Sequence, residues 1–108
     1  MANPTLRRTA VLLIRDNRSR TVCSVLLRHE GLRVVEANSP DDLLDLASEH
    51  PVDLVIADLD GTEKSSFHRE LLKHQPQVSC VFVDGGLMPE AMAKEVRLRI
   101  RKDDDPLR

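Results

Sequence analysis

The chain has 108 residues, of which 41% are hydrophobic, so it is large enough for one core and too apolar for a disordered segment. Its 16 basic and 18 acidic residues give a formal charge of -2, and only 2% of the residues are aromatic, which argues against nucleic-acid binding. No apolar run is long enough for a signal sequence or a membrane span, and Cys23 and Cys80 lack the spacing of a disulfide or metal site. We therefore expect a single soluble, cytoplasmic domain over residues 1–108.

The first third of the chain changes from a strand pattern to a helix pattern and back. The continuous apolar run over residues 9–14 predicts a strand that helices cover on both faces. From Ser19 the apolar residues take a helical spacing, and Gly31 is the expected end of that helix. Residues 32–37 then predict a second, short strand.

The next unit repeats this order. Ser39 has the features of a helix N-cap, with Pro40 at the first helical position and Asp42 as the acid of a capping box. Pro51 ends this helix, and the apolar residues 52–57 predict a third strand.

The alternation continues towards the C-terminus. We expect a helix over about residues 64–74, a strand over residues 78–83 and another helix that begins near Pro89. Strands that alternate with helices, without a hairpin signal, predict an α/β fold with a doubly wound parallel sheet flanked by helices.

The sequence of residues 96–102 fits either a strand or a helix. Val96, Leu98 and Ile100 alternate with arginines, which is the period of a strand, so we expect a short fifth strand over residues 96–102. A helix that continues through Lys102 is the alternative. The sheet is therefore expected to have four to five strands, in a fold that is shortened at the C-terminus.

Acidic residues follow three of the expected strands. Because the carboxyl ends of parallel strands meet at one edge of a sheet, these acids are expected to share a pocket. They are Asp16, Asp58, Asp60 and Asp84. Carboxylates this close must bind a metal ion, share a proton or pair with a basic side chain such as Arg15 or Lys102.

Several phrases of the sequence, in this order and spacing, resemble the receiver domain of bacterial two-component response regulators. The resemblance covers almost the whole chain and implies the flavodoxin-like receiver fold. The phrases are Val11-Leu-Leu-Ile-Arg-Asp-Asn17, His29-Glu-Gly31 to Ala37, Ser39-Pro-Asp-Asp-Leu-Leu44 and Pro51-Val-Asp-Leu-Val-Ile-Ala-Asp58. The resemblance implies that Asp58 accepts a phosphoryl group from a histidine kinase in a Mg²⁺-dependent phosphorelay.

The chain departs from the family at several of these positions. Arg15 stands where the family has the first of two adjacent acids, so Asp16 and Asp58 would hold Mg²⁺ weakly or not at all. Asp84 replaces a Ser or Thr, and the family's Lys matches Lys102 only if the fifth strand forms. We therefore expect an atypical, non-enzymatic receiver that acts by protein–protein contact, with Arg15 paired to Asp58 or Asp16.

Two further expectations follow. Val55-Ile-Ala-Asp58-Leu-Asp60-Gly61-Thr62 also resembles the first motif of haloacid-dehalogenase-type phosphatases, in which Asp58 would be the nucleophile and Asp60 the general acid–base. In addition, the absence of the family's last helix would expose apolar side chains of the first and fifth strands. A homodimer or a signalling partner is expected to cover them.

Overall fold

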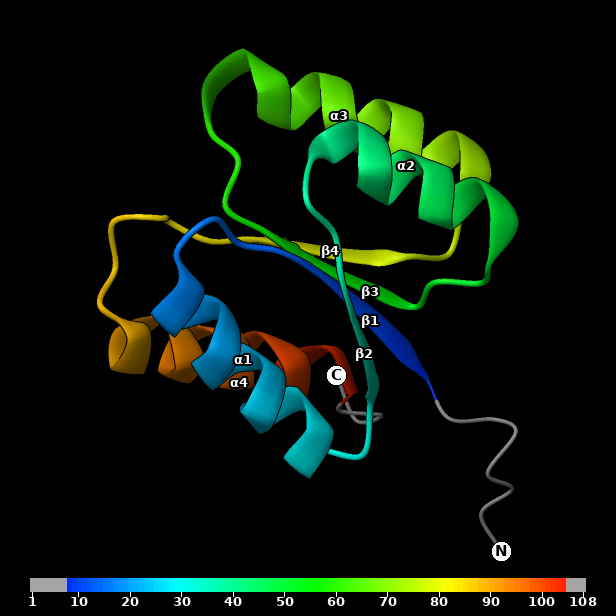
Figure 1. Cartoon of the computed structure of the whole chain (residues 1–108). Helices are drawn as coiled ribbons and strands as arrows, with labels where there is room; N and C mark the ends of the chain where they lie inside the picture. Colours follow the sequence, from blue (N-terminus) through cyan, green and yellow to red (C-terminus); the bar gives the residue numbers. More distant parts are fainter. Residues whose placement is uncertain (1–7, 105–108) are drawn as a thin grey trace, which may run out of the picture.

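The structure is a computed structural model that describes the backbone of residues 8–104 and the side chains of residues 8–100. Within this range, strands and helices alternate as the sequence predicts (Figure 1). In chain order, the elements are β1 (Thr9–Leu13), α1 (Asn17–His29), β2 (Arg33–Glu36), α2 (Pro40–Glu49), β3 (Leu54–Ala57), α3 (Gly61–His74), β4 (Ser79–Phe82) and α4 (Pro89–Asp104).

The four strands form one parallel sheet in the order β2-β1-β3-β4. Figure 1 shows α1 and α4 on one face of this sheet and α2 and α3 on the other. β1 and β3 are the central strands, and β2 and β4 are the edges. This arrangement confirms the predicted doubly wound α/β fold, with four strands.

Side chains of the central strands are buried on both faces of the sheet. Leu12 and Ile56 pack in the core under α1 and α4, whereas Val11 and Val55 pack in the core under α2 and α3. Each of these four is at most 1% exposed. Burial on both faces explains why these strands appear in the sequence as continuous apolar runs.

Local hydrogen bonds fix where the helices begin and end. The Asp42 amide donates to the Ser39 hydroxyl oxygen at 3.1 Å, and the Asn38 amide donates to the Asp42 carboxylate at 2.9 Å. These bonds confirm the predicted cap of α2. Beyond the end of α1, Gly31 takes a φ of 87°, which a residue with a side chain rarely adopts.

The expected fifth strand over residues 96–102 is wrong, because these residues belong to α4. Met92, Val96 and Ile100 recur every four residues and are at most 5% exposed, whereas Leu98 is 57% exposed. This buried stripe packs against the sheet and α1, which outweighs the strand-like alternation of residues 96–102. Lys102 is therefore helical, and its side chain lies outside the described residues.

The expected bare apolar area on the first strand is also absent. α1 and α4 cover this face of the sheet, and the side chains of residues 10–14 are at most 4% exposed. The helix that follows β4 thus lies beside α1, where it closes the core. The edge strand β4 is less covered, since Ser79, Cys80 and Phe82 are half-buried.

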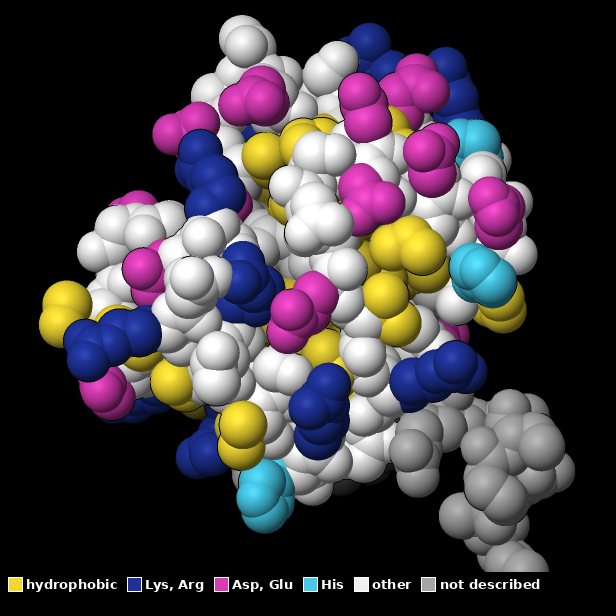
Figure 2. Space-filling view, viewed as in Figure 1, with side chains coloured by type: hydrophobic (Ala, Val, Ile, Leu, Met, Phe, Trp, Pro, Cys, Tyr) yellow, Lys and Arg dark blue, Asp and Glu magenta, His cyan; other side chains and the backbone are white. Residues whose placement is uncertain are grey.

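Acidic side chains gather on one part of the surface. Figure 2 shows them over α2, which contains acids but no Lys or Arg, whereas basic side chains are spread over the rest of this face. In residues 8–104, no helix has the length and apolarity required to cross a membrane.

Candidate functional site

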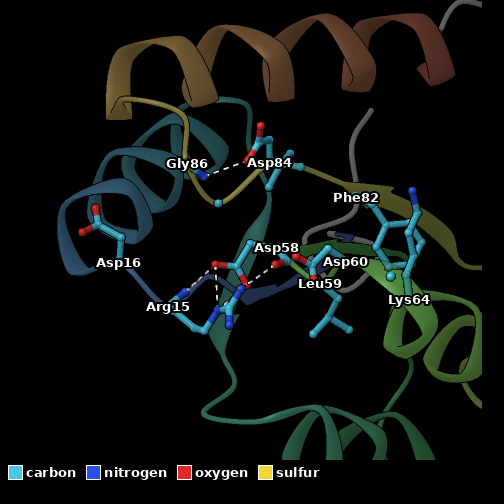
Figure 3. Close-up of a pocket in the computed structure, with 12 residues that line it drawn as sticks. Arg15, Asp16, Asp58, Leu59, Asp60, Lys64, Phe82, Asp84 and Gly86 are labelled. Carbon is cyan, nitrogen blue, oxygen red and sulfur yellow. Dashed lines mark hydrogen bonds and ion pairs between the residues drawn. The ribbon is translucent and has the colours of Figure 1, made fainter.

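A pocket of about 660 Å³ opens at the carboxyl ends of β1, β3 and β4. All four predicted acids and Arg15 line it, together with the N-terminus of α3 and the turn after β4 (Figure 3). The lining residues are Arg15, Asp16, Asp58, Leu59, Asp60, Gly61, Lys64, Phe82, Val83, Asp84, Gly85 and Gly86.

Asp58 is the buried acid of this pocket. It directly follows the central strand β3, and its amide extends the pairing with β1 by donating to the Leu13 carbonyl at 3.0 Å. The side chain is 3% exposed, and the neighbours of Asp58 in the sequence, Ala57 and Leu59, belong to the core under α2 and α3. A carboxylate this deeply buried needs donors or a positive charge within a few ångströms.

Arg15 supplies hydrogen-bond donors and a positive charge to Asp58. Its backbone amide donates to Asp58 Oδ2 at 2.9 Å, and Nε lies 3.4 Å from each carboxylate oxygen. Nη2 also donates to the Asp58 carbonyl at 3.0 Å, so the guanidinium contacts the backbone and the side chain of one residue. The structure therefore pairs Arg15 with Asp58, whereas the sequence left Asp16 open as the alternative.

The carboxylate of Asp58 still has one incompletely satisfied atom. Oδ1 is buried and has no hydrogen bond. Its 3.4 Å contact with Arg15 Nε is an ion pair but not a hydrogen bond. On the far side, a Cβ atom at Gly85 would lie 3.3 Å from Oδ2. The turn after β4 thus approaches Asp58 so closely that a side chain at position 85 would require a shift.

The other three acids line the pocket but do not join Asp58. Asp16 caps α1 by accepting the Ser19 amide at 2.9 Å, and this bond holds the pKa of Asp16 below its usual 3.8. Asp84 accepts the amide of Gly86 at 2.9 Å, as in a common turn. Asp60 is the N-cap residue of α3, but its exposed carboxylate makes no capping hydrogen bond.

Lys64 is a second cation in this pocket, which the sequence patterns did not indicate. Its Nζ lies 5.1 Å from the centre of the Phe82 ring, which also makes an edge contact with Phe67. Nothing in the sequence marked this pair, since Lys64 lies in the expected helix and Phe82 in a strand. The pair arises only because α3 packs beside the end of β4.

The donors of this pocket do not fit a Mg²⁺ ion. A hard cation prefers several carboxylate oxygens, but Asp16 and Asp84 are each held by a backbone amide, and the Arg15 guanidinium already occupies Asp58. Across the described residues, no three His, Cys, Asp or Glu side chains are grouped so that they could hold a metal. Asp58 Oδ1, which has no hydrogen bond, would be a single ligand beside the positive charge of Arg15.

Comparisons with known proteins identify the fold. No protein-family model and no curated protein matches the sequence. A response regulator from Thermotoga maritima superposes with a TM-score of 0.68 at 14% identity, covering 89% of this chain and 99% of that one. The receiver domain of the hybrid histidine kinase CckA gives a TM-score of 0.57 at 22% identity, over 85% and 98% of the chains.

A de novo designed Rossmann fold protein is also similar, with a TM-score of 0.65 at 14% identity over 87% of this chain and 97% of that one. A designed protein that matches this well shows that the layers and their order carry no activity by themselves. Functional conclusions must therefore come from the pocket. What the chain shares with the two natural proteins is the flavodoxin-like, CheY-like receiver fold.

Proposed function

We propose that the chain is an atypical receiver domain that acts in signal transduction through protein–protein contact, without phosphorylation of Asp58. The observation that carries the proposal is the contact of the Arg15 guanidinium with both oxygens of Asp58 at 3.4 Å. This contact supplies the positive charge that a buried carboxylate otherwise obtains from a metal ion. The charge is covalently attached, so it does not depend on an ion concentration.

The same contact disfavours phosphoryl transfer. A nucleophilic carboxylate needs an oxygen that faces the donor, and the transferred group needs cations that neutralise its equatorial oxygens. In this pocket the backbone amide and guanidinium of Arg15 hold Oδ2, and the exposed carboxylates of Asp60 and Asp84 would repel an incoming phosphate. We infer that the domain stays in one conformation.

Incubation with acetyl phosphate and MgCl₂, followed by peptide mass spectrometry, tests this proposal. The wild-type chain is expected to carry no phosphate on Asp58, and Asp58→Asn supplies the blank. In Arg15→Asp, a carboxylate replaces the guanidinium, so Mg²⁺ is expected to shift the NMR signals around Asp58 in this variant alone. A phosphorylated Asp58 in the wild-type chain would refute the proposal.

One observation favours the alternative, a phosphorylatable response-regulator receiver. Asp58 lines the pocket and its Oδ1 has no hydrogen bond, and the Arg15 side chain is 71% exposed, so a rotation of Arg15 towards solvent would uncover the carboxylate. In that case, a histidine kinase would be the partner, and Asp58 the phosphoacceptor. The phosphodonor experiment separates the two functions directly.

A small haloacid-dehalogenase-like phosphatase is the more distant alternative. Its support is the unbound carboxylate of Asp60, which lines the same pocket as Asp58. Turnover of a generic phosphate ester that disappears in Asp60→Asn would favour this activity over the receiver function.

We further propose a bacterial, cytoplasmic setting, with a signalling protein or a second copy of the chain as the partner. The described cysteines are free thiols, and burial raises the pKa of Cys23 to about 11, so Cys23 is a weakly reactive core residue. A free, buried thiol is the usual state of cysteine in a reducing compartment.

A further inference from the structure

Within residues 8–104, no strand pairs with the outer side of the edge strand β4. Along β4, the amides of Ser79 and Val83 donate to carbonyls of the β3 side, at 3.0 and 2.9 Å. Backbone groups alternate in direction along a strand, so the N–H and C=O of Cys80 and Phe82 point away from β3. These two residues present two donors and two acceptors along the open edge of the sheet (Figure 1).

The sequence of β4 does not protect this edge. Natural sheets blunt their edges with charged residues or proline, and the other edge strand, β2, has the exposed charges of Arg33 and Glu36 at its ends. Residues 78–83 contain neither a charge nor a proline, and most of them have high strand propensity. β4 is therefore suited to pairing with another strand.

The backbone of β4 favours an antiparallel partner with the same sequence, whereas the charges at its two ends do not choose an orientation. At the C-terminal end, Lys64 lines the same pocket as Asp60 and Asp84. At the N-terminal end, Lys73 of α3 is paired with Glu70 at 3.0 Å. The outward backbone groups are arranged symmetrically about the middle of the strand, so two antiparallel copies present each donor to an acceptor of the other copy through the same residues on both sides.

We propose that β4 pairs with β4 of a second copy of this chain, in antiparallel orientation, so that the two sheets become one. With the two-fold axis at Val81, Cys80 of each chain lies opposite Phe82 of the second copy. Because both residues present their N–H and C=O outward, each pair forms two backbone hydrogen bonds. This inference deepens the proposed function, since it specifies the surface and geometry of one partner.

Apolar side chains beside the edge would be covered in the same contact. Phe82 is half-buried against His68 of α3, with ring centres 5.7 Å apart. Leu72, one helical turn further along α3, is 38% exposed. The two-fold axis places α3 of both copies on the same face of the joined sheet, so these side chains border the interface from both sides.

The test uses substitutions at Cys80 that separate the backbone from the side chain. Cys80→Pro removes the outward N–H without removing a bond to β3, and Cys80→Ala removes the thiol but keeps the N–H. Sedimentation velocity up to about 1 mM, suited to a small interface, is expected to give twice 12.2 kDa for wild type and Cys80→Ala. Cys80→Pro is expected to remain at 12.2 kDa.

Amide hydrogen exchange supplies a second measurement. The Phe82 amide is expected to be protected in wild type and Cys80→Ala, and to exchange at least tenfold faster in Cys80→Pro. If circular dichroism shows that the proline variant does not fold, Cys80→Lys replaces it, because an edge lysine also blocks pairing.

Three results would overturn the inference. They are a wild-type monomer at every concentration, a dimer that Cys80→Pro leaves intact, and a protected Phe82 amide in a monomer, which would indicate pairing within one chain. None of them bears on whether Asp58 is phosphorylated. Conversely, phosphorylation of Asp58 would refute the proposed function and leave the β4 contact standing.

Discussion

Replacement of Arg15 by alanine is the most direct perturbation of the pocket. The variant loses the contacts of Nε with the Asp58 carboxylate and the bond from Nη2 to the Asp58 carbonyl. It keeps the backbone amide bond at 2.9 Å, so Asp58 retains one donor. We expect the folded structure to persist with a less stable pocket.

The distance and the exposure of the Arg15–Asp58 pair determine how much unfolding free energy Arg15→Ala loses. At 3.4 Å, two unit charges attract by about 1 kcal/mol at the dielectric constant of water, and by about 5 kcal/mol at an effective constant of about 20. Because the Arg15 side chain is 71% exposed, solvent screening places the pair near the lower value. The lost Nη2 bond adds about 1 kcal/mol. The total of about 2 kcal/mol corresponds to a fall in Tm of roughly 10 °C.

Urea denaturation at neutral pH measures the free energy of unfolding for this comparison. Arg97→Ala removes the same charge from an exposed position on α4 and is expected to change stability by less than about 0.5 kcal/mol. A double-mutant cycle with Asp58→Asn then isolates the coupling between the two side chains, expected at about 1 kcal/mol.

The result that would refute this reasoning is equally definite. If Arg15→Ala and Arg97→Ala lose the same small free energy, or if the cycle gives no coupling, the guanidinium does not stabilise the carboxylate. The buried carboxylate of Asp58 would then need another stabilising contact, and Arg15 could not be the residue that makes this receiver atypical.

Three further outcomes can be measured. Gln75→Ala is expected to cost about 1–3 kcal/mol of unfolding free energy, because the Gln75 amide group donates to two carbonyls at the end of α2 and accepts the Val52 amide. The exposed Gln77 can be replaced almost without effect. Burial raises the pKa of Cys80 to about 12, so alkylation by iodoacetamide should keep rising about tenfold per pH unit above 9.0, and a plateau near 9.0 would contradict this. The Ser19 amide lowers the pKa of Asp16 from 3.8, so its contribution to stability is present above 3.8 and is lost as the pH falls through the lowered pKa; an NMR titration with a midpoint at or above 3.8 would disagree.

Local sequence patterns predicted the secondary structure well in segments where only one such pattern was present. The cap at Ser39 and the continuous apolar run of β3 specify structure within a few residues, and both occur as expected. At residues 96–102 two periods overlap, since Val96 and Ile100 fit a helix and a strand alike. Only Met92, four residues before Val96, extends the helical spacing into the core, and the packing of α4 on α1 decides between the two.

The position of the pocket in the fold could be predicted from the sequence, but the side-chain contacts within it could not. Parallel strands bring their carboxyl ends together, so the acids that follow them line one pocket. Which acid meets Arg15 depends on side-chain directions that the sequence does not specify: Asp16 turns to its own helix, whereas Asp58 turns inward. Lys64 was not predictable, because its place beside Phe82 follows from how α3 packs on the sheet.

The position of the Arg15–Asp58 pair has a consequence for the order of folding. Its two members are 43 residues apart and extend neighbouring central strands, so they meet only when β1 and β3 lie in register. The loop closure that brings the strands together is therefore complete before the pair can contribute. We therefore predict that Arg15→Ala raises the unfolding rate more than it lowers the folding rate, which stopped-flow kinetics in urea would measure.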